Sequence, residues 1–192
     1  MTEYFAHETA EVSSEAKIGK GTRIWHHAQI REGVIIGENC HISKGVYIDK
    51  NVKIGNNVKI QNGVNVYTGV TLEDDVFLGP ASAFTNDLYP RSQSKDWEVV
   101  HTLLKKGTSV GANATILCGI FLGEYCMIAA GAVVLNNTLP HSLMVGNPAR
   151  LKNFVCGCGN ELILRHNHSY NYNYFCAKCK KHIVISFQTE HT

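Results

Sequence analysis

A six-residue spacing of aliphatic side chains runs through most of this chain and limits the folds that it can adopt. The spacing holds without a slip from Val12 to Leu78, and it returns from Val110 to Val134. A small or β-branched residue stands two positions before each member. A helix cannot produce this pattern, because its 3.6-residue period would spread a six-residue repeat around the circumference. Short strands joined by tight turns fit it, since side chains at i and i−2 share one face of a strand.

We therefore predict an all-β solenoid with three short strands in each coil. The coils of such a prism stack at the ~4.8 Å spacing of paired strands and bury their aliphatic residues in one continuous column. The glycines and asparagines between the strands suit corners where φ is positive. Cys40 and Cys126 fall on inward positions, which predicts buried thiols.

The spacing is interrupted between Leu78 and Val110, and we place an inserted loop at residues 79–107. A loop of this length adds nothing to the core, so it is a common place for functional residues. This segment contains Asn86 and Arg91.

Composition excludes several classes of partner. The formal net charge is +2 and the basic residues are scattered, so no nucleic-acid partner is expected. No apolar run approaches the ~18 residues that a membrane span needs, and the N-terminus lacks the features of a secretory signal. Seven cysteines in such a chain indicate a reducing compartment, and we expect a cytoplasmic protein.

The six-residue spacing ends after Lys152, which predicts a solenoid domain at 1–152 and a second segment at 153–192. Two cysteine pairs in this segment resemble a zinc ribbon, in which four thiolates hold a structural Zn²⁺ and leave no open position. The first pair is spaced C-x-C where ribbons have C-x-x-C, so His166, His168 or His182 could replace one ligand. A metal-free hairpin is the alternative. The predicted ligands are Cys156, Cys158, Cys176 and Cys179.

Four segments carry a narrower resemblance: IWHHAQI (24–30), KIQNGVNVY (59–67), FTNDLYPRS (84–92) and KKGTSVGANATIL (105–117). They resemble the hexapeptide-repeat, left-handed β-helix acyltransferase superfamily. Within it they are most similar to the UDP-2-acetamido-3-amino-2,3-dideoxyglucuronate N-acetyltransferases of surface-polysaccharide (O-antigen and lipopolysaccharide) synthesis. The left hand of the helix is implied by this resemblance alone. The resemblance also implies a homotrimer in which the inserted loop closes an active site on the neighbouring subunit.

The same resemblance implies the site residues. Asn86 is implied to lie beside the reacting sugar, where an amide can orient the amine but cannot act as a base. His41 precedes the inward Ile42 and should point onto the surface of the prism, so it is the rival catalytic residue, with His26 a further candidate base. We expect substrate contacts at Trp25, His26, Asn62, Tyr67 and Arg91, and the planar guanidinium of Arg91 could pair with the sugar's pyrophosphate or carboxylate. Acetyl-CoA is expected in the groove between two prisms, on Gly111, Ala129, Ala130, Gly131, Arg150 and Lys152.

Other functions remain open at this point. The acceptor could be a dTDP-3-amino-3,6-dideoxyhexose, or a hydroxyl group that requires a histidine base. The solenoid could also be a non-catalytic scaffold. A γ-carbonic-anhydrase-like zinc enzyme is less favoured, because the spacings of His26, His27 and His41 do not suggest three converging ligands.

Overall fold

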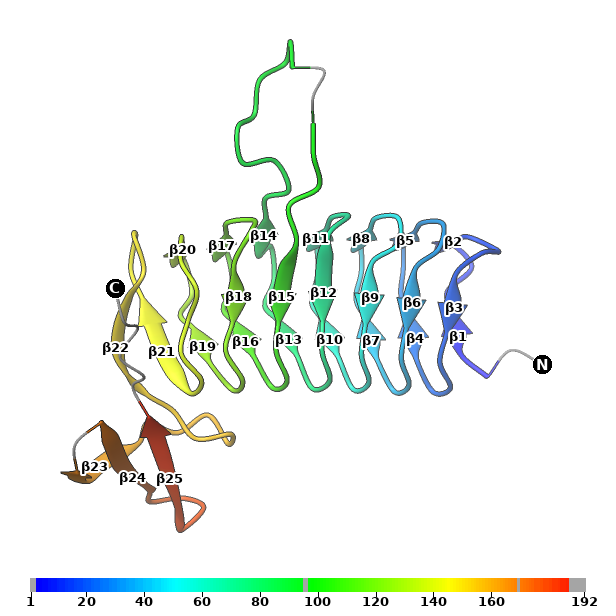
Figure 1. The fold of residues 1–192 in the computed structure, drawn as a ribbon. Coiled ribbons are helices and arrows are strands. Elements are labelled where there is room, and N and C mark those ends of the chain that lie inside the picture. The colour runs from blue at the N-terminus through cyan, green and yellow to red at the C-terminus, as the bar shows by residue number, and fades with distance from the viewer. Residues whose placement is uncertain (1–2, 95–96, 169, 187–192) are drawn as a thin grey trace.

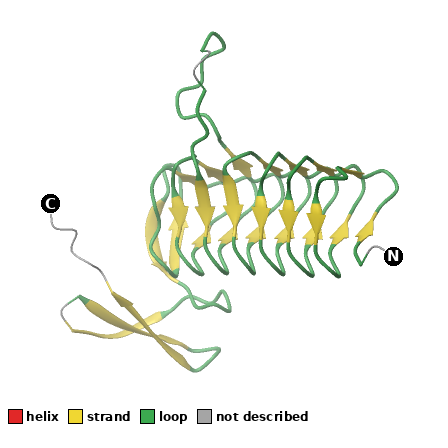
Figure 2. Cartoon of the chain, turned by 45° about the vertical axis from the view of Figure 1, so that its right-hand side comes forward, coloured by secondary structure: helices red, strands yellow, loops and turns green. Residues whose placement is uncertain are grey.

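A computed structural model describes residues 3–94, 97–168 and 170–186 of the chain. Figure 1 shows a prism of stacked coils with a loop projecting from one corner and a small sheet at the C-terminal end. Only strands, turns and loops occur among the described residues (Figure 2). The described part of the chain therefore contains no helix that could cross a membrane.

Three sheets form the walls of the prism, and we name them A, B and C in chain order. Sheet A contains β1 (Phe5–Ala6), β4 (Arg23–Ile24), β7 (His41–Ile42), β10 (Lys59–Ile60), β13 (Phe77–Leu78), β16 (Ser109–Val110), β19 (Met127–Ile128), β21 (Ser142–Val145) and the antiparallel β22 (Arg150–Phe154). Sheet B contains β2 (Glu11–Val12), β5 (Gln29–Ile30), β8 (Tyr47–Ile48), β11 (Asn65–Val66), β14 (Ala83–Phe84), β17 (Thr115–Ile116) and β20 (Val133–Val134). Sheet C contains β3 (Lys17–Ile18), β6 (Ile35–Ile36), β9 (Lys53–Ile54), β12 (Val70–Leu72), β15 (Thr102–Leu104) and β18 (Phe121–Leu122).

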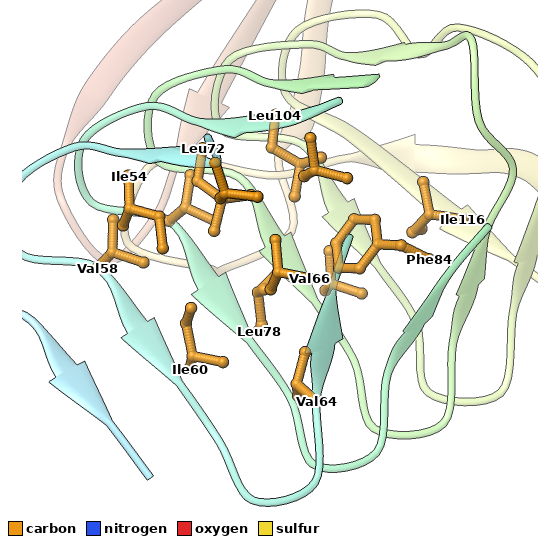
Figure 3. Packing of buried hydrophobic residues seen from close by; sticks show 14 of the residues in the cluster. Ile54, Val58, Ile60, Val64, Val66, Leu72, Leu78, Phe84, Leu104 and Ile116 are labelled. Atoms are coloured by element: carbon orange, nitrogen blue, oxygen red, sulfur yellow. The ribbon is translucent and has the colours of Figure 1, made fainter. Parts of the chain in front are cut away.

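Side chains along these short strands point alternately out of and into the prism, and the inward ones form the core. In most of them the first residue points outward, and the second is an aliphatic residue that points into the prism, as in Lys59–Ile60. Figure 3 shows side chains from all three sheets meeting inside the coils. The inward residues are almost fully buried from Ile24 onward, whereas Val12 and Ile18 are only partly buried because the first coil has no coil before it. The six-residue spacing therefore predicted the core correctly.

Tight corners join the strands, and we call them AB, BC and CA after the sheets they connect. Asparagine takes a left-handed conformation at several corners, with φ of 58° at both Asn51 and Asn57. At the CA corner the side-chain amide of Asn57 donates to Asp75 Oδ1 at 3.0 Å, one coil away. Side-chain bonds between successive coils thus support the corners that the glycine and asparagine pattern predicted.

The inserted loop is shorter than the predicted 79–107. Phe84 continues the inward series six residues after Leu78, and Leu104 resumes it six residues before Val110. The loop therefore occupies the residues between β14 and β15 and leaves the prism at a BC corner (Figure 1). The prediction was too wide because neither Phe84, an aromatic residue, nor Leu104, on the far side of the insertion, was recognised as a member of the repeat.

The C-terminal segment forms a separate three-stranded sheet of β23 (Ile163–His168), β24 (Asn171–Cys176) and β25 (Lys181–Ser186). A second apolar cluster fills it and includes Phe154, Leu162 and Tyr174. The segment joins the prism where the Val155 amide donates to the His141 carbonyl at 2.7 Å. Strand β22 runs across the predicted boundary at 152, and the division of the chain there stays a prediction.

Candidate functional site

Most of the predicted site residues lie along sheet A and the AB corner. Trp25 and His26 follow β4, and His41 begins β7. Asn62 is exposed at the same corner farther along the prism. The residues predicted to hold acetyl-CoA follow β16 and β19, nearer the C-terminal end: Gly111, Ala129, Ala130 and Gly131. We call this line of residues the AB edge.

Aromatic rings cluster at the N-terminal end of the AB edge. The ring centroids of Phe5 and Trp25 are 5.6 Å apart with an edge-to-face angle of 61°. The rings of Trp25 and His26 are parallel within 6° at 6.2 Å, and His7 stacks on His26 at 3.5 Å. Partial loss of water, followed by the neighbouring His7 and His27, lowers the pKa of His26. The cluster offers flat, partly exposed aromatic surfaces.

His41 lies next to this cluster and between two cations. It pairs in register with Arg23 on one side and Lys59 on the other. Desolvation lowers the pKa of His41, and the charges of Lys59 and Arg23 lower it further. A general base works best with a pKa near the working pH, and a carboxylate often orients it. No carboxylate contributes to the lowered pKa of His41. The surroundings of His41 thus favour a neutral imidazole.

Two glycines predicted to contact acetyl-CoA have different surroundings. A Cβ on Gly111 would lie 2.5 Å from the backbone nitrogen of Ala130, so the stacking of coils alone requires glycine there. A Cβ on Gly131 would meet no atom within 4 Å. The same open space occurs at Gly45 and Gly63 of this corner, so it leaves room for a ligand along the AB edge, and the contact of Gly131 with acetyl-CoA stays a prediction.

The remaining substrate residues lie at the BC corner, where the inserted loop leaves the prism. Asn86 is half-buried and follows Thr85, whose hydroxyl accepts a bond from the Cys118 amide at 2.9 Å. Tyr67 lies beside the base of the loop, because β11 pairs with β14. Arg91 is exposed, and its guanidinium donates to the carbonyl of Pro90.

A polar network that the sequence did not reveal lies beside Tyr67. Arg31 Nη1 donates to the Tyr47 hydroxyl at 3.4 Å, and that hydroxyl donates to Asp49 Oδ1 at 3.0 Å. The rings of Tyr47 and Tyr67 are 6.3 Å apart. The signal was present in the sequence, because Arg31, Asp49 and Tyr67 occupy the same corner position in three successive coils.

The two groups of candidate residues do not meet in one chain. His41 and Asn62 lie on or beside sheet A, whereas Asn86 and Tyr67 lie at the far side of sheet B. Arg150 and Lys152 are exposed on β22 at the C-terminal end. A site that uses both groups therefore needs a second copy of the chain.

The four predicted metal ligands do come together. The Sγ atoms of the four cysteines all lie within 4.8 Å of one another. The Cys158 and Cys176 sulfurs are 3.7 Å apart, close to the roughly 3.8 Å edge of a tetrahedron with ~2.3 Å zinc–sulfur bonds. The Asn160 backbone amide, followed by the Cys179 side chain, lowers the pKa of Cys158 to about 6, whereas desolvation raises the pKa of Cys156 and the bond to Cys158 raises that of Cys179 to about 12. The residues fit a Zn²⁺ ion, which requires thiolates.

The histidines considered as substitutes are not needed for this set. His182 Nδ1 is 3.0 Å from Asn173 Oδ1, and the described cluster contains cysteines only. The side chain of His168 lies outside the described residues. In the second pair, Cys176 Sγ accepts a bond from the Cys179 amide at 3.4 Å, which orients the sulfur toward the cluster.

Comparisons with known proteins extend these observations. The family "Bacterial transferase hexapeptide (six repeats)" matches residues 15–50, and "Hexapeptide repeat of succinyl-transferase" matches residues 106–136. A dTDP-3-amino-3,6-dideoxy-α-D-galactopyranose 3-N-acetyltransferase from Aneurinibacillus thermoaerophilus is 46% identical over 158 residues, which cover 82% of each chain. This chain belongs to the hexapeptide-repeat acyltransferases. Family membership favours an enzyme over a non-catalytic scaffold.

Solved structures of this superfamily share the left-handed parallel β-helix with the chain. PerB from Caulobacter crescentus, solved with CoA and GDP-perosamine, aligns with a TM-score of 0.50 at 21% identity over 78% of this chain. The alignment spans 57% of PerB, a little over half its length. A hexapeptide-repeat acetyltransferase from Vibrio cholerae, solved with acetyl-CoA, aligns with a TM-score of 0.55 at 23% identity over 65% of this chain and 72% of that chain.

Proposed function

We propose that this acyltransferase moves the acetyl group of acetyl-CoA to the 3-amino group of a nucleotide-linked sugar. The observation that carries the proposal is the 46% identity, across 82% of both chains, to an enzyme named for that reaction. The predicted acceptor is UDP-2-acetamido-3-amino-2,3-dideoxyglucuronate, for surface-polysaccharide synthesis. The name of the Aneurinibacillus relative favours a dTDP-3-amino-3,6-dideoxyhexose as the second candidate.

The active site is proposed to form between neighbouring subunits of a homotrimer. In a closed ring of identical chains each subunit uses two different surfaces, one toward each neighbour. The AB edge of one chain and the inserted loop of the next are suitable partners, because the edge holds most of the candidate residues and the loop holds Asn86 and Arg91. Such a ring would bring Asn86 of one chain to the acetyl-CoA groove of its neighbour.

The chemistry needs little from the protein beyond positioning. The neutral amine attacks the thioester carbonyl, the C–S bond breaks, and the proton lost by the nitrogen ends on the CoA sulfur. The Asn86 amide oxygen can accept a hydrogen bond from the amine and fix its direction, and fixed geometry removes much of the barrier. The backbone amides of Ala129, Gly131 and Ala132 already donate to carbonyls of the coils, so stabilisation of the oxyanion would need other donors. His41 remains the candidate base if a base is required.

Zinc, in this proposal, has a structural role in the C-terminal sheet. Four cysteine ligands leave no position for a substrate or water. The sheet has a small apolar cluster of its own, so a metal ion would supply much of its stability. Its ligands are the four cysteines described above.

The test is release of CoA thiol from acetyl-CoA across a panel of amino sugars. The panel contains UDP- and dTDP-linked 3-amino sugars and a GDP-linked 4-amino sugar, and mass spectrometry identifies the acetylated product. We expect release with a 3-amino sugar and little with the 4-amino sugar. Absence of thiol release with every member would overturn the proposal, and preference for the 4-amino sugar would correct its regiochemistry.

A further inference from the structure

Three nitrogen-bearing side chains form a ladder on the outer face of sheet A. Arg23, His41 and Lys59 occupy the outward positions of β4, β7 and β10 and pair directly in register. Neighbouring strands are about 4.8 Å apart, so the three side chains leave the sheet side by side. Arg23 and Lys59 are exposed, and His41 is partly buried between them.

Among the residues that the structure describes, no carboxylate forms an ion pair with this ladder. The ion pairs between described residues are Arg31–Glu32 and Lys106–Asp75, and both lie elsewhere. The charged groups that act on His41 are Lys59 and Arg23 alone. Arg23 and Lys59 stand on either side of the neutral His41, about 9.6 Å apart, so an anion lying across His41 would be attracted by both charges. Arginine and lysine together provide several donors suited to phosphate oxygens.

We propose that Arg23, His41 and Lys59 bind the diphosphate group of the acceptor. This inference rests on the proposed function, because it takes the acceptor to be a nucleotide-linked sugar. A diphosphate has charged oxygens on two neighbouring phosphorus atoms, so it can contact adjacent steps of the ladder. The surface would bind a nucleoside diphosphate more tightly than the corresponding monophosphate.

The rest of the AB edge gives the bound acceptor a direction. The aromatic cluster of Phe5, Trp25 and His26 lies at the N-terminal end of the ladder and offers flat surfaces to a nucleobase. Toward the C-terminal end come Asn62 and then Gly131 with its open space. The nucleoside therefore points to the N-terminal coils and the amino sugar to the acetyl-CoA groove. This order brings the reacting amine toward the thioester.

His41 then has a binding role in place of an acid–base role. The Trp25 indole donates to Nδ1, so the neutral ring carries its proton on Nε2. That N–H can donate to a phosphate oxygen. Glutamine has a side-chain amide N–H at a similar distance from the backbone, so it can replace this donor without replacing a base.

The test measures binding of UDP and dTDP, and of UMP and dTMP, by calorimetry. The variants are Arg23→Ala, Lys59→Ala, His41→Ala and His41→Gln in the full-length protein. Lys53→Ala is the matched control, because Lys53–Ile54 in sheet C has the same dipeptide and the same outward position as Lys59–Ile60. We expect Arg23→Ala and Lys59→Ala each to weaken diphosphate binding about tenfold and monophosphate binding less. His41→Gln should bind better than His41→Ala, and Lys53→Ala should bind as the unmodified chain does.

The outcomes separate this inference from the proposed function. Unchanged diphosphate binding in the Arg23 and Lys59 variants overturns the inference, even if amino sugars are acetylated. Weakened diphosphate binding with no acetylation of any amino sugar supports the ladder and overturns the proposed function. A variant that dissociates the oligomer, as seen by light scattering, while binding diphosphate normally would make the ladder a subunit contact and overturn the inference.

Discussion

The indole Nε1 of Trp25 donates to Nδ1 of His41 across two successive coils, at 3.4 Å. The two residues are sixteen positions apart in the sequence and meet because β4 and β7 are neighbours in sheet A. The bond fixes which nitrogen of His41 carries the proton. It also stabilises the neutral imidazole, in the same direction as desolvation and the flanking cations.

Lys59→Ala should raise the pKa of His41, because it removes a positive charge that disfavours the imidazolium. The pKa of His41 in the unmodified protein should lie below the usual ~6.5. Histidine titration followed by NMR measures both values. Lys53→Ala is the control and should leave the pKa in place, and an unchanged pKa in Lys59→Ala would show that the two groups do not interact.

The same shift predicts a dependence of stability on pH. A histidine with a lowered folded-state pKa binds a proton more readily when the chain is unfolded. The contribution of His41 to stability is therefore complete above about pH 6.5 and decreases as the pH falls through the lowered pKa. His41→Gln should lessen this decrease in urea unfolding measured at successive pH values.

Cys176→Ser should remove zinc from the protein. Purified full-length protein is expected to contain about one Zn²⁺ per chain, and the variant should lose nearly all of it because one of four thiolates is gone. Metal analysis measures the content, and Cys118→Ser is the control because Cys118 is a buried cysteine outside the cluster. Absence of zinc from the unmodified protein would favour the metal-free hairpin, and full zinc content in Cys176→Ser would show that Cys176 is not a required ligand.

Two adjacent isoleucines offer a direct test of the inward and outward positions. Ile36 is 2% exposed and Ile35 is 43% exposed, although both lie in β6. Ile36→Ala should lower the free energy of unfolding by about 2–5 kcal/mol, because it leaves a cavity in the column. Ile35→Ala should lower the free energy of unfolding by well under half of that amount. Denaturant unfolding measures both, and equal losses would contradict the register of the strand.

The repeat made the core and the corners predictable, because both follow from local rules of strand alternation and backbone conformation. Phe84 and Leu104 kept the spacing, yet the insertion between them hid it. Residues on the outer faces were harder to predict. Arg23, His41 and Lys59 are one coil apart in sequence, but their proximity becomes evident only when the strands are known to stack in register. Asn86 could be identified only by resemblance, since its proposed partners belong to another chain.

Gly131→Ala should raise the KM for acetyl-CoA several-fold, because a methyl group would project into the open space where the ligand is proposed to lie. The left-handed backbone at this position, with φ of 70°, also makes alanine cost about 1 kcal/mol of stability. Gly45→Ala is the matched control: it lies at the same AB corner, has φ of 65°, and its added Cβ also meets nothing within 4 Å. Both variants should lose similar stability, and a KM change shared by both would point to strain instead of ligand contact.

Asn86→Ala should lower kcat about 100-fold while leaving the KM for acetyl-CoA nearly unchanged, because the amide orients the acceptor and does not hold the donor. Steady-state thiol release measures both constants, and His41→Ala serves for comparison. A larger fall of kcat in His41→Ala, with Asn86→Ala tolerated, would favour the histidine as a base.

The position of Asn86 on the inserted loop adds a second test of the same residue. If each site combines the loop of one chain with the AB edge of the next, trimers mixed from Asn86→Ala and Arg23→Ala/Lys59→Ala chains contain some sites with neither defect. Random mixing makes these about a quarter of all sites. The mixture should therefore be more active than either variant alone, and native mass spectrometry verifies that mixed trimers have formed. Verified mixed trimers without recovery would mean that the loop and the edge act within one chain.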